Sequence, residues 1–265
     1  MLIDFHMHLF PDALAERTIA KLAETSSCTP YADGTLDCLR KRMDSWGVDL
    51  GVSLHIATKP SQQTNVNNFA VSVQSSRLVS FGSVHPDAPD ALEELERIKA
   101  LGLKGVKLHP DYQGFFVDDP RVFPLYQKIA RLGLPLLLHC GWDPVSPQSV
   151  HTPPEALARV LEAFPQLTVV GAHLGGMKRY DEVEKHLAGK YPNLYIDISM
   201  SPRYCTDRDQ FRRILNLQGA ERVLFGTDCP WGSAPETLDY LFATGLTQEE
   251  NEQILFRNAQ RLLGL

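Results

Sequence analysis

Short apolar runs alternate with amphipathic stretches along the whole chain. Runs such as LPLLLH at 134–139 and LTVVGAH at 167–173 are almost wholly apolar, which is typical of strands covered on both faces by helices. The same pattern recurs often enough to predict eight strands, at residues 2–8, 50–57, 78–85, 105–109, 134–139, 167–173, 194–199 and 223–228.

The segments between these strands carry signals for helix starts. Thr247 is followed three residues later by Glu250, and Thr152 by Glu155 across two prolines, which is the pattern of a capping box. Strands that alternate with helices form either a closed barrel or a doubly wound sheet. The first strand ends in HMHLFP, without the glycine-rich loop of a doubly wound nucleotide-binding sheet. We therefore predict the α/β class, as a (β/α)8 TIM-type barrel forming a single domain over residues 1–265.

Length, composition and charge agree with this fold and restrict the function. The chain has 265 residues, close to the roughly 250 of a typical barrel. Its net charge of -6 disfavours non-specific nucleic-acid binding, which needs a basic surface. No apolar run approaches the ~20 residues of a membrane span, and the first residues do not resemble a signal peptide. Five cysteines without a Cys-x-x-Cys pair favour reduced thiols. We expect a cytoplasmic protein that binds neither nucleic acid nor membrane; a homo-oligomer is compatible with the sequence.

Histidines stand at the carboxyl ends of five predicted strands, and an aspartate stands at the end of the eighth. In a parallel barrel all these ends meet at one face, where active sites lie. A lone strand-end histidine is more often a hydrogen-bonded structural residue, so the joint pattern is what points to a site. Its members are His6, His8, His85, His109, His139, His173 and Asp228.

Four of these residues are predicted to hold a metal. His6 and His8 are two apart and so share a strand face, while His139 and Asp228 enter from strands five and eight. Three imidazoles and a carboxylate suit a divalent ion such as zinc, iron or manganese. Such an ion lowers the pKa of its bound water to about 7. Asp228 could also accept the proton of that water, and His173 could orient it or stabilise charge on the substrate.

The chain resembles the amidohydrolase superfamily, and specifically its amidohydrolase-related (amidohydrolase-2) branch, which includes aminocarboxymuconate-semialdehyde decarboxylase. The stretches that carry the resemblance are IDFHMHLFPD, GVKLHP, LLLHCG, GAHLGG, LYIDIS, LFGTDCPW and NAQRLLGL. It implies a metal-binding barrel with His6, His8, His139 and Asp228 as ligands and His173 as the strand-six histidine. Zinc is the most common cofactor in the decarboxylase-like members, and the four converging ligand residues predict one metal per chain.

Strand four departs from the binuclear members of this superfamily. They place a carboxylated lysine or a glutamate there, whereas this chain has Lys107 and His109. We expect both to face the substrate, with a bridging role for Lys107 or simple neutralisation of buried charge as alternatives. Arg203, after strand seven, could bind a substrate carboxylate or be an ordinary solvated side chain.

Two reaction classes share these ligands. The first hypothesis is hydrolysis of an amide, ester or lactone of a small molecule by metal-bound hydroxide. The alternative is non-oxidative decarboxylation of an unsaturated or aromatic carboxylic acid. A third hypothesis, a barrel that keeps its metal without catalysis, fits poorly, because both acid–base partners, Asp228 and His173, are present.

Overall fold

Eight parallel strands form the centre of the molecule. The computed structural model describes residues 1–265, and its strands occupy the predicted positions but are shorter. They are β1 (Ile3–Met7), β2 (Leu50–Leu54), β3 (Leu78–Phe81), β4 (Val106–Leu108), β5 (Leu136–Leu138), β6 (Val169–Gly171), β7 (Leu194–Asp197) and β8 (Val223–Leu224).

The strands close into a barrel through backbone bridges outside the regular ladders. Strands β1–β3 and β4–β8 each pair in sequence order and in parallel. Gly82 bridges to Val106 between β3 and β4. The N–H of Phe5 donates to the carbonyl of Phe225 at 2.9 Å, which joins β1 to β8. The predicted (β/α)8 architecture is confirmed.

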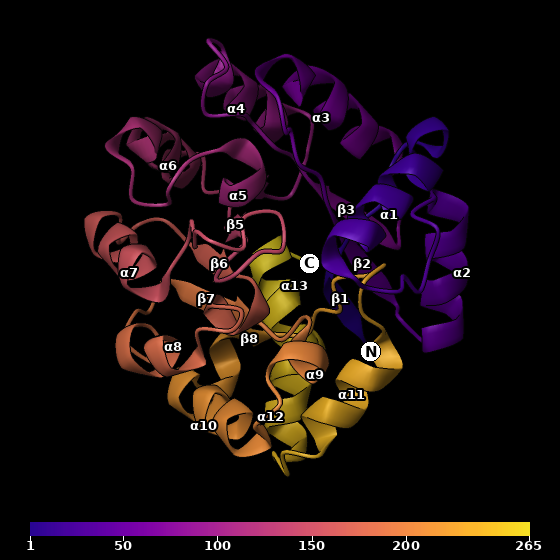
Figure 1. Cartoon of the computed structure of the whole chain (residues 1–265), viewed down its shortest axis with the longest axis vertical. Coiled ribbons are helices and arrows are strands. Elements are labelled where there is room, and N and C mark those ends of the chain that lie inside the picture. Colours follow the sequence, from indigo (N-terminus) through magenta and orange to yellow (C-terminus); the bar gives the residue numbers. More distant parts are fainter.

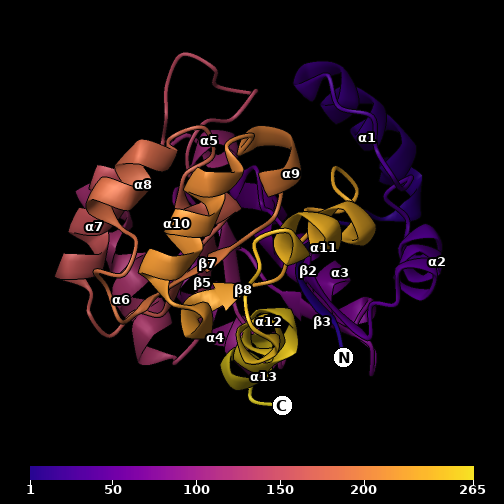
Figure 2. The ribbon, with the colours of Figure 1, turned by 90° about the horizontal axis from the view of Figure 1, so that it is seen from below.

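Helices surround the barrel, and both termini lie on the side away from the carboxyl ends of the strands (Figures 1 and 2). The short helices α12 and α13, joined by a π-helical turn at Gln253–Arg257, cover that lower side. The helices are α1 (Asp12–Ser26), α2 (Leu36–Trp46), α3 (Gln63–Ser72), α4 (Ala91–Ala100), α5 (Pro110–Gln113), α6 (Phe123–Arg131), α7 (Pro154–Ala163), α8 (Tyr180–His186), α9 (Ser201–Tyr204), α10 (Arg208–Gln218), α11 (Ala234–Phe242), α12 (Gln248–Glu252) and α13 (Asn258–Leu263).

The capping box predicted at Thr247 is present, with Glu250 bonding back to the cap. The one predicted at Thr152 is absent. There the helix begins one residue later than the pattern suggests, at Pro154, with Pro153 as the cap residue. Proline supplies the helical φ without a side-chain acceptor, so the hydroxyl of Thr152 is not used. None of the helices has the combination of length and hydrophobicity that crossing a membrane requires.

One extra residue in β1 decides which side chains face the barrel interior. Asp4 pairs with Gly51 and Met7 with Ser53, so three steps on β1 match two on β2. Before this β-bulge Ile3 belongs to the inner apolar cluster, and after it Met7 belongs to the outer one. Bulges re-aim side chains in this way beside active sites. The shift of one position turns His6 toward the mouth of the barrel.

Candidate functional site

Several of the predicted site residues lie just beyond the last paired residue of their strand. His109 and His139 follow the last paired residues of β4 and β5, and His173 lies in a short 3-10 turn. Asp228 and His173 have φ angles of 65° and 58°, which non-glycine residues adopt rarely. Such strained backbone persists where the surroundings hold it, often at functional sites.

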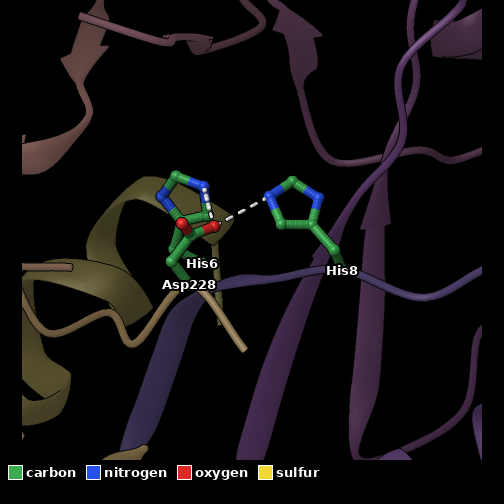
Figure 3. A group of neighbouring side chains, drawn as sticks. All are labelled: His6, His8 and Asp228. Carbon is green, nitrogen blue, oxygen red and sulfur yellow. Dashed lines mark ion pairs between the residues drawn. The ribbon is translucent and has the colours of Figure 1, made fainter. Parts of the chain in front are cut away.

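His6, His8 and Asp228 converge on one point, as Figure 3 shows. The Nε2 atoms of His6 and His8 lie 3.3 Å and 3.1 Å from Oδ1 of Asp228. Gly226 makes room for this arrangement, because a Cβ added there would lie 3.0 Å from the Cβ of His6. Burial opposes ionisation of Asp228, but the charge of His6 and a hydrogen bond from His8 hold the pKa of this carboxyl below its usual value. The three side chains therefore present two imidazole nitrogens and a carboxylate to one position.

Each of these histidines is fixed by its other ring nitrogen. Nδ1 of His6 lies 2.8 Å from Oδ2 of Asp197, and Nδ1 of His8 lies 2.9 Å from the carbonyl oxygen of Leu54. When Nδ1 donates to such an acceptor, Nε2 keeps a free lone pair. Burial lowers the pKa of His6, which favours the neutral ring that a metal needs.

Asp197 is the centre of a buried network beneath the site. Its Oδ1 accepts the N–H of His173 at 3.0 Å and the N–H of Ser199 at 3.1 Å. The hydroxyl of Ser199 also lies 2.8 Å from Nδ1 of His173. The sequence left open whether Asp197 supports the metal residues or pairs with a cation, and its contact with His6 favours the first role.

His139, predicted as the fourth ligand, does not join the other three in this structure. Its Nε2 lies 3.5 Å from Oδ2 of Asp143, and its Nδ1 lies 3.1 Å from Nε2 of His173. His109 stacks on it with ring centroids 4.2 Å apart and also points to Asp143, at 3.5 Å. His139, His109 and Asp143 thus form a second buried group of potential metal ligands.

Lys107 projects from β4 and is 1% exposed. Burial lowers its pKa to about 8, although the carboxylates of Asp228 and Asp197 oppose that shift. Lys107 therefore lies close enough to both carboxylates to feel their charge, inside the barrel where the sequence placed it.

Arg203 lies in α9 on the rim and is exposed. Its guanidinium donates to the carbonyl oxygen of Ser27 at 3.1 Å. It lines a cavity of about 810 Å³ that also includes Thr227 and Trp231, which flank Asp228 in the sequence. Cys140 and Cys229, expected to point away from the site, both belong to the outer apolar cluster.

Sequence reasoning missed two carboxyl groups of the site. Asp4 is fully buried and accepts the backbone N–H groups of His6 at 3.1 Å and Thr227 at 3.0 Å, so it ties β1 to the segment that carries Asp228. Asp143 lies in the loop after β5; burial raises its pKa to about 7. The signal for Asp143 was its position four residues after His139, on a loop at the catalytic face of the barrel.

The residues present fit a divalent metal. Besides the convergence on Asp228, three of the buried polar atoms that lack a hydrogen-bond partner lie on and beside the second group: Nε2 of His139, Nδ1 of His109 and Oδ2 of Asp111. Buried polar atoms are nearly always satisfied. The orphaned atoms and the nitrogen–oxygen donor set both suit a borderline divalent ion.

Comparisons with known proteins identify relatives of this chain by sequence. The chain is 26% identical over 229 residues to 2-amino-3-carboxymuconate-6-semialdehyde decarboxylase of Dictyostelium discoideum, covering 74% of this chain and 63% of that protein. It is 25% identical to gamma-resorcylate decarboxylase of Polaromonas sp., covering 74% of this chain and 73% of that protein. It thus spans less than two thirds of the first relative and more of the second.

Solved structures agree on the fold. A TIM-barrel protein from Bordetella bronchiseptica superposes with a TM-score of 0.78 at 23% identity, covering 99% of this chain and 98% of that one. A 2,6-dihydroxybenzoate decarboxylase superposes with a TM-score of 0.72 at 19% identity, covering 100% and 99%. The amidohydrolase family model (Amidohydro_2) matches residues 3–265. This chain therefore belongs to the amidohydrolase family, in the branch that the sequence motifs indicated.

Proposed function

We propose that this chain is a metal-dependent decarboxylase that releases CO2 from a small aromatic or unsaturated carboxylic acid. The observation that carries the proposal is the convergence of His6 Nε2 and His8 Nε2 on Oδ1 of Asp228. This ligand set serves hydrolysis equally well. The curated relatives, however, are named as decarboxylases, which favours decarboxylation over hydrolysis.

His6, His8 and Asp228 would hold one divalent ion, and His139 is retained as the proposed fourth ligand. The bound ion would supply a positive charge that orients substrate oxygens and stabilises negative charge on them. Zinc remains our prediction. Manganese is the main alternative, because a dihydroxybenzoic acid decarboxylase from Polaromonas sp. with the same fold has manganese bound; the nitrogen–oxygen donor set also suits iron.

The chain's own residues divide the remaining tasks. In decarboxylation the bond between the carboxyl carbon and its neighbour breaks, CO2 leaves, and a proton takes its place on that neighbour. Lys107 and His109 would hold the substrate's polar groups. Asp228, which is ionised, would pass a proton from a water molecule to that carbon, and the hydroxide left behind would combine with CO2 to give bicarbonate. His173, which contacts Nδ1 of His139, would keep that ring in position. The buried surroundings strengthen each of these electrostatic contacts.

Two substrate panels test the proposal. Protein loaded with zinc or manganese is incubated with aromatic and unsaturated acids while CO2 release is measured, and in parallel with esters, amides and lactones while new acid, amine or alcohol is measured. CO2 release that disappears in the Asp228→Asn variant supports the proposal. Turnover on the second panel alone overturns it in favour of hydrolysis, and bound metal without turnover on either panel favours the non-enzymatic hypothesis.

A further inference from the structure

Two cations, Lys178 and Arg203, lie near the ring of Tyr204 on the rim of the barrel. Nζ of Lys178, in the loop after β6, lies 3.3 Å from the ring centroid of Trp142 and 5.1 Å from that of Tyr204. Cζ of Arg203 lies 5.6 Å from the Tyr204 centroid. Aromatic rings attract cations at such distances, so the rings stabilise both positive charges without a carboxylate partner.

Neither cation has an acidic partner. No carboxylate lies within ion-pair distance of Lys178 or Arg203, whereas Arg179, the next residue, pairs with Glu182 at 2.8 Å. Partial burial lowers the pKa of Lys178, and the charge of Arg203 lowers it further. Lys178 also has a φ of 59°, a costly conformation for a side chain of this size. Two like charges kept together in a protein of net charge -6 would be stabilised by an anion.

This cationic pair, Lys178 and Arg203, adjoins the proposed active site. Arg203 lines the 810 Å³ cavity together with Thr227, the neighbour of Asp228. Burial raises the pKa of Tyr204 and the charge of Asp228 raises it further, which places this ring within electrostatic reach of the site.

Another part of the cavity lining, on α11, is acidic. It carries Glu236 and Asp239, and Glu236 already accepts a hydrogen bond from the hydroxyl of Tyr31 at 2.7 Å. The carboxylates of α11 therefore repel an anion, whereas Arg203 attracts one; Arg208 is the other cation in the cavity lining. The ring of Trp231, which also lines the cavity, offers an apolar surface against which a planar molecule can pack.

We propose that Lys178 and Arg203 bind a second acidic group of the substrate. The preferred substrates are then planar acids with two anionic groups, of which one reacts beside Asp228 and the other is retained on the rim. The identity of the reacting group rests on the proposed function; the preference for a dianion does not.

Binding of two unreactive probes tests the inference without turnover. The metal-loaded protein is titrated with benzoate and with isophthalate by calorimetry, in the wild type and in the variants Lys178→Gln and Arg203→Gln. Arg179→Gln is the matched control, because it removes a neighbouring charge that is already paired. We expect isophthalate to bind the wild type more tightly than benzoate. Each of the two rim variants should weaken isophthalate binding roughly 5- to 10-fold and leave benzoate binding within about twofold, as for partly screened charge-assisted contacts. Added salt should reduce the preference.

The outcomes separate this inference from the proposed function. Equal affinity for the two probes overturns it, as does a loss of isophthalate binding that is no larger in the rim variants than in Arg179→Gln. If the dianion preference depends on Lys178 and Arg203 but no acid releases CO2, the subsite stands and the decarboxylase proposal fails. If monoacids and diacids are decarboxylated with equal kcat/KM and the rim variants change neither value, the decarboxylase proposal stands and the inference of a second anion-binding subsite fails. Thermal denaturation shows whether the exposed substitutions leave the fold intact.

Discussion

Nδ1 of His6 lies 2.8 Å from Oδ2 of Asp197, and both side chains are buried. This contact joins β1 to β7 across the barrel and fixes the ring so that its Nε2 faces Asp228. Burial alone would raise the pKa of Asp197, but the charge of His6 and the hydrogen bond from its ring hold it well below its usual value. An ionised hydrogen-bond acceptor is therefore positioned behind a proposed metal ligand. This arrangement makes the imidazole a stronger electron-pair donor to a metal.

Asp197→Asn should weaken metal affinity about 10- to 100-fold, because the amide keeps the shape but loses the charge that orients His6. Competition with a fluorescent chelator measures the dissociation constant directly, whether or not the enzyme turns over. Asp37→Asn is the control, since that carboxylate is 79% exposed and pairs only with Lys41. Unchanged affinity in Asp197→Asn would remove this residue from the account of the metal site.

The double variant His6→Ala/His8→Ala should lose its divalent metal, because two of the converging donors disappear. Elemental analysis of protein purified without added metal should give about one ion per chain for the wild type and close to none for the variant. His151→Ala removes a histidine outside the site, whose Nδ1 contacts the carbonyl oxygen of Phe115, and should keep the metal. Equal metal content in all three proteins would show that the ligand assignment is wrong.

Asp228→Asn should abolish turnover, because the amide cannot carry the proton and binds a cation less well than a carboxylate. Loss of a proton-transfer group lowers rates by about 10²–10⁴-fold. Single-turnover measurements with metal added in excess separate the chemical step from metal loss. Near-normal kcat under those conditions would exclude Asp228 as the proton carrier.

Asp143→Asn tests the carboxyl group that sequence analysis missed. Asp143 contacts both His109 and His139, so the variant should misplace these rings and lower kcat roughly 10-fold or more, while the metal stays bound. Ser146→Ala changes the same loop at its contact with Asp111 and should have a smaller effect. If Asp143→Asn instead loses the metal, this carboxylate is a ligand rather than a positioning group.

The buried ring of His55 should make the free energy of unfolding sensitive to acid. Its ring packs against Phe69 with centroids 5.4 Å apart, and burial lowers its pKa to about 3 from an ordinary value of 6.5. Below pH 6.5 the unfolded chain binds a proton that the folded chain excludes, so stability falls as the pH drops toward 3. The limiting slope is about 1.4 kcal/mol per pH unit.

Chemical denaturation between pH 7 and pH 4 measures this slope. His55→Gln should make the free energy of unfolding less dependent on pH over that range, even if it is less stable at pH 7. His186→Gln, on the surface helix α8, controls for the loss of one histidine and should keep the wild-type slope. A parallel pH dependence in all three proteins would contradict the interpretation.

The sequence by itself determined the barrel and the list of side chains at its mouth. Apolar runs such as 134–139 must be covered on both faces, and parallel strands bring their carboxyl ends to one side, so the sequence alone places His6, His109 and Asp228 at the same face of the barrel. That inference needs only the periodicity of strands and the direction of the chain.

Only the tertiary structure decided how these side chains face one another. The bulge between Asp4 and Met7 changes which side chains of β1 face the barrel interior. No local sequence pattern encodes this bulge, because it depends on pairing with both β2 and β8. The choice of Asp197 as partner for His6, and of Asp143 for His139, likewise joins residues whose spacing in sequence carries no periodic signal. Such contacts are set by the closure of the barrel, which brings distant strand ends within hydrogen-bond distance only after the whole chain has folded.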